Sequence, residues 1–224
     1  MKYIIANLKE HQNLTEANTW INTFINILRS SKPIKEALHS QKLRIILAPS
    51  APFLVLFKTG IHEFSGVSLA AQDVSVYEKG SCTGEIGSHA LSGIVDYVIL
   101  GHSERRKFFG ETNQSVKKKL DTLNGYMMLP ILCVSSLEDM IDIDRGLIAY
   151  EPADAIGGGH NYPVETVLEF RTRLNPNQST PFLYGGSVDE NNQGIYLKSP
   201  DINGLLIGSA SLDAARFCQI VSAV

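Results

Sequence analysis

The chain has 224 residues, a hydrophobic content of 44% and a net charge of -3 at pH 7. This hydrophobic content is ordinary for a globular protein with a full core, and no apolar run approaches the ~18 residues that a membrane span requires. The slightly acidic charge excludes a general binder of polyanions, so neither nucleic acid nor a membrane is an expected partner.

The three cysteines, Cys82, Cys133 and Cys218, are widely spaced and form no C-x-x-C pair. This spacing is typical of reduced thiols in an intracellular protein and indicates neither a disulfide framework nor a zinc site. The apolar stretch 3–6 is too short for the hydrophobic region of a signal peptide. We therefore expect a cytoplasmic protein.

Short apolar runs recur along the whole chain, and most are nearly continuous Val, Ile, Leu and Ala without polar alternation. Such runs are typical of parallel strands that are buried on both faces. The predicted strands cover residues 3–8, 44–48, 67–71, 97–101, 128–134, 147–151, 181–185 and 204–208.

Segments with helical periodicity lie between these strands. The clearest spans residues 15–29, where Trp20 and Phe24 belong to an apolar face and Thr15 is the expected N-cap. The run Lys117-Lys118-Lys119 is expected on a solvated helix face. Weaker patterns predict further helices at 113–124, 164–174, 189–197 and 211–221.

Strands and helices alternate without a change of composition or a linker, which favours a single domain over residues 1–224. Eight such units predict a closed (β/α)8 barrel of parallel strands. An open doubly wound sheet is the alternative, but only closure gathers the polar strand ends and glycine turns around one mouth. Because only 18 residues separate Cys133 from Glu151, the fifth helix region must be short or distorted.

The first predicted strand ends in Asn7 and Lys9, which alternation directs to the same side, into the barrel mouth. A lysine that projects inward is costly unless it is paired or meets an anion. An internal ion pair with Glu104 and an anionic ligand fit this lysine equally well, and the two can coexist.

The fourth strand delivers His102, and a helix beginning near Ser103 would direct its positive end at the imidazole. That arrangement would lower the pKa of His102 and keep it neutral, able to donate a hydrogen bond to a carbonyl. A structural histidine is the alternative. The sixth strand delivers Glu151, whose carboxylate can remove a proton. The two strand ends predict proton-transfer chemistry on a small phosphorylated substrate.

Glycine turns follow the last three predicted strands. The turns at 184–188 and 208–211 are adjacent strand-to-helix junctions, which in barrels form a recurrent phosphate site from backbone N–H groups. The segment from Pro152 to Gly159 can fold over as a lid or offer backbone N–H groups to an anion. No lysine or arginine accompanies these turns, so we expect backbone donors to hold the anion.

These motifs resemble the triosephosphate isomerase family, and the resemblance runs from one end of the chain to the other. It implies the TIM-barrel form of the fold and an isomerase of glycolysis and gluconeogenesis. The motifs that carry it are Asn7-Leu8-Lys9, Ala71-Gln72, Cys82-Thr83-Gly84-Glu85-Ile86, Gly101-His102-Ser103-Glu104-Arg105-Arg106, Tyr150-Glu151-Pro152 with the following residues to Gly159, and the turns at 184–188 and 208–209.

The resemblance implies interconversion of dihydroxyacetone phosphate and D-glyceraldehyde 3-phosphate through an enediolate, without a cofactor or metal. Glu151 would be the base that shuttles the proton, and His102 would polarise the carbonyl as a neutral imidazole. Lys9 and Asn7 would hold the substrate and stabilise the enediolate.

Further residues follow from the same resemblance. The phosphate is expected at the backbone donors of Gly157, Ser187, Gly208 and Ser209. The residues expected to support the site are Ser103, Glu104, Thr83 and Tyr184. The loop that runs from Gln72 to Ile86 is expected to reach into a neighbouring subunit and make a homodimer, and pairing of dimers into a tetramer is left open.

Four segments depart from the family's pattern. Asp154 stands where the family usually has a tryptophan in the leading hinge of its lid, and the trailing hinge is His160-Asn161-Tyr162 instead of Lys-Thr-Ala. Ser209 replaces the second glycine of the last phosphate turn but keeps its N–H. The fifth helix region is shorter than in common members.

Two other functions are weighed against the isomerase. A catalytically weakened barrel that acts as a phosphate-binding interaction subunit is suggested by Asp154 and the short fifth helix region. Another phosphosugar enzyme, such as an aldolase, lacks support because no lysine ends the sixth strand for a Schiff base and no His/Asp cluster suits a metal. An assay of triose phosphate interconversion separates these functions.

Overall fold

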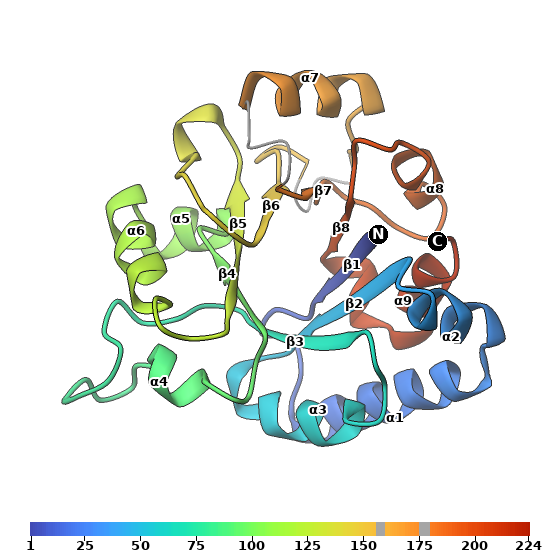
Figure 1. Cartoon of the computed structure of the whole chain (residues 1–224), viewed down its shortest axis with the longest axis horizontal. Helices are drawn as coiled ribbons and strands as arrows, with labels where there is room; N and C mark the ends of the chain where they lie inside the picture. Colours follow the sequence, from blue (N-terminus) through green and yellow to red (C-terminus); the bar gives the residue numbers. More distant parts are fainter. Residues whose placement is uncertain (156–159, 175–179) are drawn as a thin grey trace.

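Eight parallel strands close into a barrel in the computed structural model, which describes residues 1–155, 160–174 and 180–224 (Figure 1). The (β/α)8 barrel is therefore confirmed, and the open doubly wound sheet is wrong. The strands are β1 (Lys2–Asn7), β2 (Leu43–Ala48), β3 (Val67–Ala71), β4 (Tyr97–Leu100), β5 (Leu129–Val134), β6 (Leu147–Tyr150), β7 (Phe182–Tyr184) and β8 (Gly204–Ile207).

Closure takes place between the first and last strands, where Tyr3 lies opposite Gly204 and Ala6 lies opposite Ile207. The approach is so close that a Cβ on Gly204 would lie 1.9 Å from the carbonyl oxygen of Tyr3. Glycine is thus required where β8 meets β1, because any side chain would push the two strands apart.

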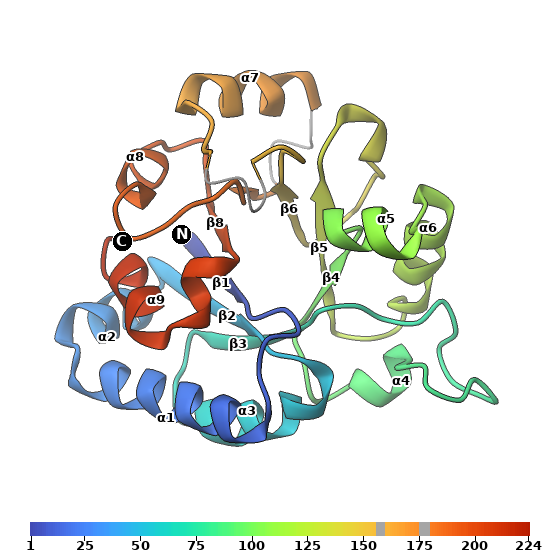
Figure 2. The same cartoon turned by 180° about the vertical axis from the view of Figure 1, so that it is seen from behind.

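Helices surround the barrel on its outside, as Figures 1 and 2 show from opposite sides. None of the helices in the described ranges is long and apolar enough to cross a membrane. They are α1 (Leu14–Ser30), α2 (Lys32–His39), α3 (Leu54–Ile61), α4 (Ser88–Leu91), α5 (Ser103–Phe109), α6 (Asn113–Thr122), α7 (Val164–Leu174), α8 (Gln193–Leu197) and α9 (Ala214–Val221), with 3-10 turns η1 (Ala51–Phe53), η2 (Leu137–Asp139) and η3 (Ser209–Leu212).

Helix α1 begins before the predicted N-cap, Thr15. Asn13 is the N-cap: its side chain accepts a hydrogen bond from the N–H of Glu16, whose carboxylate accepts one from the N–H of Asn13. This reciprocal capping box satisfies two orphan donors, which Thr15 inside the helix could not do. The apolar face carries Trp20, which stacks on Phe24 as the periodicity predicted.

The last two predicted helices are shorter than expected at their N-terminal ends. Asp189 accepts hydrogen bonds from the N–H groups of Asn191 and Asn192, which makes a turn and delays α8 to Gln193. Asp213 caps α9 by accepting from the N–H groups of its first turn, so this helix begins only at Ala214. Short polar side chains that bond to nearby backbone compete with helix in this way.

The fifth helix region is reduced to the 3-10 turn η2, so the prediction of a short or distorted element is confirmed. Asp139 holds this turn because its Oδ2 accepts hydrogen bonds from the N–H groups of both Ser135 and Ser136. Figure 1 shows the segment between β5 and β6 as an extended excursion from the barrel.

Two hydrophobic clusters follow from the alternation of side chains along the strands. One packs between the strands and the helices, and includes Ile4 and Ala6 of β1 and Ile148 and Tyr150 of β6. The other fills the barrel interior and consists of Ile5, Ile46, Ala48, Ala70, Tyr97, Ile99, Ile131, Cys133, Leu147, Ala149, Leu183 and Leu206. A residue two positions beyond an interior side chain therefore points into the barrel mouth.

Candidate active site

Strand alternation brings Asn7 and Glu151 over the barrel mouth. Asn7 lies two residues beyond Ile5 of the interior cluster, and Glu151 lies two residues beyond Ala149. Both polar side chains are almost fully buried, with 5% of Asn7 and 3% of Glu151 exposed. Burial of a carboxylate this deep requires partners, because an unpaired buried charge is strongly unfavourable.

Glycines that follow the strands β7 and β8 leave space for the side chains of Glu151 and Lys9. A Cβ on Gly185, which follows β7, would lie 3.0 Å from Glu151 Cγ. A Cβ on Gly208, which follows β8, would lie 3.4 Å from Lys9 Cε. The glycine turns therefore make room for the chemical groups as well as turning the chain.

His102 is the N-cap of α5 and contacts Glu151 directly. Its Nδ1 accepts a hydrogen bond from the N–H of Glu104 at 3.2 Å, and its Nε2 lies 3.1 Å from Glu151 Oε1 and 3.3 Å from Asn7 Nδ2. Because Nδ1 accepts and an ionised carboxylate can only accept, the neutral imidazole carries its proton on Nε2. This tautomer directs an N–H donor into the barrel mouth.

The pKa values of this pair shift in opposite directions. Burial lowers the pKa of His102, but the charge of Glu151 and the hydrogen bond to it raise the pKa, and the net direction is upward. Burial raises the pKa of Glu151, but His102 lowers it through its charge and hydrogen bond, and the net direction is downward. The expected lowering of the His102 pKa is therefore wrong for the free chain, because a carboxylate in contact outweighs a helix terminus.

We predict that the pKa of His102 falls when Glu151 is replaced by glutamine. Removing the carboxylate removes the main influence that raises this pKa and leaves burial, which lowers it. A 15N NMR titration of the ring nitrogens measures the effect, and above the pKa it should place the proton on Nε2. An unchanged pKa, or a proton on Nδ1, would contradict the described geometry.

Lys9 pairs with a carboxylate and also lines the mouth of the barrel. Its Nζ lies 2.5 Å from Glu104 Oε1. Its backbone has φ of 52°, a left-handed conformation that is unfavourable for a residue with a Cβ. Neighbouring side chains hold it there: Asn7 accepts from its N–H, while Ser50 and Gln72 donate to its carbonyl oxygen. The supporting roles of Ser50 and Gln72 were not predicted.

The candidate residues gather around one pocket of about 300 Å³. The lining includes the predicted residues Asn7, Lys9, His102, Glu151, Ser187, Gly208 and Ser209. It also includes Arg216 of α9, so the expectation that no arginine accompanies the glycine turns is wrong. Arg216 lies in the first turn of α9, eight residues after Gly208. The helical periodicity of the sequence does not indicate that its side chain lines the pocket.

The other predicted residues stand apart from this lining. Gly157 lies outside the described residues. Thr83 is exposed on the loop after β3, and Tyr184 is fully buried in the cluster between the strands and the helices. The hydroxyl of Ser103 is buried without a hydrogen-bond partner among the described residues, while Glu104 pairs with Lys9 and donates its N–H to His102 Nδ1.

Two departures from the family's pattern contact each other. The hydroxyl of Tyr162 donates to Asp154, with 2.9 Å to either carboxylate oxygen. The backbone of Tyr162 is held as well, because its N–H donates to Tyr184 and its carbonyl oxygen accepts from Tyr196. Asp154, placed where hydrophobic packing was expected, therefore makes a polar contact with the second hinge segment.

A buried ion cluster lies under the junction of β4 and α5. Lys119 is only 6% exposed, so its predicted place on a solvated face is wrong. Its Nζ contacts Asp73 at 2.7 Å and also contacts Glu111, whose other oxygen accepts from the N–H of Gly101 at 3.1 Å. Glu111 thereby fixes the backbone immediately before His102, a role that the sequence pattern did not indicate.

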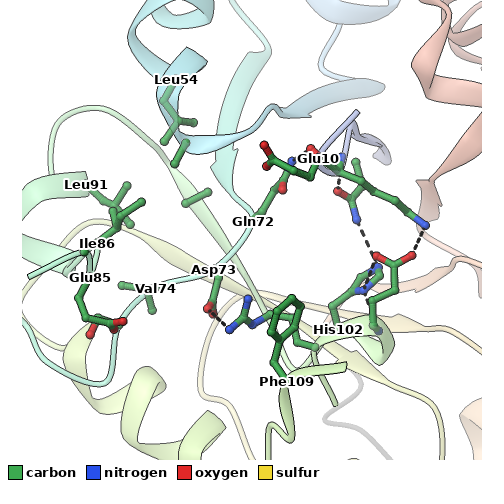
Figure 3. A pocket seen from close by; sticks show the side chains of 18 residues that line it. Glu10, Leu54, Gln72, Asp73, Val74, Glu85, Ile86, Leu91, His102 and Phe109 are labelled. Atoms are coloured by element: carbon green, nitrogen blue, oxygen red, sulfur yellow. Dashed lines mark hydrogen bonds and ion pairs between the residues drawn. The ribbon is translucent and has the colours of Figure 1, made fainter. Parts of the chain in front are cut away.

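A second cavity of about 450 Å³ adjoins the pocket and shares Asn7, Lys9 and His102 with it. Figure 3 shows Ile86 and Leu91 on one side of this cavity and His102 on the other. No group of three or more metal-ligating side chains occurs in the described part of the chain.

Comparison with known proteins gives consistent matches over the full length. A family model described as Triosephosphate isomerase matches residues 2–224. The chain is 34% identical to the triosephosphate isomerase of Aquifex aeolicus, with 98% of each chain covered. It is 34% identical to that of Nostoc sp., covering 99% of this chain and 98% of the relative, and 31% identical to that of Mycoplasmopsis pulmonis, covering 98% and 96%.

Proposed function

The chain belongs to the triosephosphate isomerase family and interconverts dihydroxyacetone phosphate and D-glyceraldehyde 3-phosphate, and we propose that Glu151, His102, Lys9 and Asn7 carry out this reaction. The observation that carries the assignment is the 3.1 Å contact between Glu151 Oε1 and His102 Nε2 in a pocket that Lys9 also lines. The full-length matches to triosephosphate isomerases support this function over the interaction-subunit alternative.

The proton moves through Glu151 in both halves of the reaction. The Glu151 carboxylate takes a proton from C1 of dihydroxyacetone phosphate while the Nε2–H of His102 donates to the carbonyl oxygen at C2, which gives an enediolate. His102 gives its Nε2 proton to the oxygen at C2 and takes the hydroxyl proton from the oxygen at C1. Glu151 then returns its proton to C2 while the electron pair on the C1 oxygen re-forms a carbonyl. The positive charge of Lys9 and the amide of Asn7 stabilise the negative charge that develops on the oxygens.

The phosphate is proposed to lie at the other end of the pocket, on the backbone donors of Ser187, Gly208 and Ser209. These residues follow β7 and β8 and line the same pocket as Glu151. Ser187 has φ of 49°, a strained conformation of the kind that is retained where a loop must present its backbone in one way. Gly157 is proposed as a further donor on the resemblance alone.

A triose without its phosphate tests this assignment. Binding energy from the phosphate can be used to organise the reacting end, so D-glyceraldehyde should lose turnover as well as affinity. Steady-state kinetics on both substrates give kcat and KM separately. Equal values of kcat for the two substrates would show that the phosphate end of the pocket plays no part in catalysis.

We propose a homodimer in which the loop from Gln72 to Ile86 enters the second cavity of a neighbouring copy. Figure 1 shows this loop projecting away from the barrel, and it carries exposed Tyr77 and exposed Thr83. Light scattering should give at least twice the chain mass of 24.6 kDa, with four chains indicating the tetramer. A mass of one chain would contradict the proposal.

Two coarser properties complete the proposal. Residues 1–224 form a single domain, since β1 and β8 from the two ends of the chain pair in one barrel. The location is the cytoplasm, because the family's substrates are glycolytic intermediates. A stable autonomous fragment after limited proteolysis would contradict the first, and recovery of the native protein in a membrane fraction would contradict the second.

A further inference from the structure

Arg216 brings a positive charge to the phosphate end of the pocket. It lies in the first turn of α9 and lines the pocket together with Ser187, Gly208 and Ser209. Its guanidinium binds Glu190 in a bidentate pair, with Nε 2.8 Å from Oε1 and Nη2 2.9 Å from Oε2. This fork geometry fixes the orientation of the guanidinium more firmly than a single contact could.

The pair connects the two turns that are proposed to hold the phosphate. Glu190 belongs to the turn after β7, three residues beyond Ser187, and Arg216 belongs to the segment after β8. The Arg216 side chain is still 46% exposed while paired, and the Glu190 side chain is 21% exposed. Arg216 is therefore held in place without being withdrawn from the pocket.

Carboxylates also lie near the guanidinium of Arg216. Asp189 lines the pocket, and its Oδ1 accepts from the N–H groups of Asn191 and Asn192. Asp213 accepts from two N–H groups at the start of α9. The charge of Glu190 is balanced by Arg216 alone among the described residues. Without this arginine, a phosphate dianion would approach Asp189 in the lining and the nearby charge of Glu190 with no guanidinium to offset them.

The other cation of the pocket is already paired. Lys9 contacts Glu104 and belongs to the reacting end, next to His102. A phosphate monoester carries up to two negative charges near neutral pH. Backbone N–H groups provide direction for the phosphate but only partial charges, so a guanidinium at the rim adds attraction that these donors lack.

We propose that Arg216, oriented by Glu190, is a phosphate-binding residue of this chain that selects for phosphate monoester dianions. The inference rests on the proposed function, which places the phosphate at Ser187, Gly208 and Ser209. Its effect is modest and falls with salt, because the pair is partly exposed and its charge is screened by ions.

The test compares Arg216→Gln with Glu190→Gln at low and high ionic strength. The measured quantities are KM for D-glyceraldehyde 3-phosphate and the inhibition constant of inorganic phosphate. Arg216→Gln should raise both by roughly two- to fivefold at low salt, and the increase should disappear at high salt. Glu190→Gln keeps an amide oxygen for the guanidinium but removes a negative charge, so it should lower both values.

Two further variants make the comparison sharper. Arg216→Lys retains the charge without the fork and should recover part of the lost affinity. Arg29→Gln is the matched control for net charge, because Arg29 forms a similar exposed pair with Glu63 on residues that do not line the pocket. This control should leave KM and the inhibition constant at the wild-type values.

The outcomes distinguish direct attraction of the phosphate by Arg216 from a purely structural role of the Arg216–Glu190 pair. If the pair only braces the two turns, Arg216→Gln and Glu190→Gln should both weaken phosphate binding, to the same extent at low and high salt. That result would overturn the inference, as would wild-type values for Arg216→Gln. Failure of the proposed function looks different, because phosphate would then not compete with substrate even in the wild-type enzyme.

Discussion

Replacing Glu151 with glutamine is expected to lower kcat by at least ~10²-fold, the usual scale for the loss of a positioned general base. The amide is nearly isosteric with the carboxylate, so the pocket should keep its shape, but the amide cannot take a proton from carbon. The lowered pKa of Glu151 keeps this group ionised near neutral pH, which makes the loss specific to base function. A coupled assay of triose phosphate interconversion gives kcat.

A control for this substitution is Glu151→Asp, which keeps the charge but withdraws the carboxylate by one methylene group. It should retain more activity than Glu151→Gln, since charge is preserved while the distance to the substrate increases. Calorimetric binding of inorganic phosphate should be similar in both variants, because the phosphate end is unchanged. Turnover near that of the wild type in pure Glu151→Gln would rule out Glu151 as the base.

Replacing Lys9 with methionine is expected to lower kcat/KM by roughly 10²- to 10³-fold, as for the loss of a group that stabilises charge in the transition state. Methionine keeps an unbranched side chain only one atom shorter but removes the positive charge at the reacting end of the pocket. It also leaves Glu104 without its partner at 2.5 Å, so a negative charge faces the developing enediolate. Steady-state kinetics measure the loss.

The matched variant Glu104→Gln separates these two contributions. It removes the carboxylate while Lys9 stays charged, so it should cost far less activity than Lys9→Met if the lysine acts on the substrate. If the ion pair is only structural, the two substitutions should have similar effects on kcat/KM and on the thermal midpoint. That equality would contradict the role proposed for Lys9.

The strands could be predicted from sequence because parallel barrel strands are buried on both faces. Their continuous apolar runs left each boundary within two residues of the observed one. Alternation of side chains then directed Asn7 into the mouth, whereas Lys9 lies beyond the end of β1 and reaches the mouth from a left-handed backbone conformation. The first helix was predicted for the same kind of reason, since its apolar face repeats with the helical period.

Contacts between segments distant in the sequence could not be predicted in this way. Lys119 belongs to a run of three lysines, which predicts a surface position. Its burial is possible only because the carboxylates of Asp73 and Glu111 contact its ammonium group. Arg216 sits on a short helix whose starting residue depends on the cap made by Asp213. Such pairings depend on where loops bring side chains, which residue periodicity does not encode.

The two hinge segments of the lid give another example of a contact that the sequence did not predict. Asp154 and Tyr162 each depart from the family's pattern, and no sequence pattern indicated that the two residues meet. Their hydrogen bond shows that the two departures form one contact. The pKa of His102 was likewise misjudged from the helix alone, because the contact with Glu151 is set by the barrel and not by the local sequence.

A crystal structure with a phosphorylated hydroxamate, whose planar head resembles the enediolate, tests the assembled site in one measurement. The account predicts a head within hydrogen-bond distance of Glu151, His102 Nε2 and Lys9 Nζ, with the phosphate on the backbone of Ser187 and Ser209. A ligand bound in the adjoining cavity beside Ile86, away from Glu151, would contradict it.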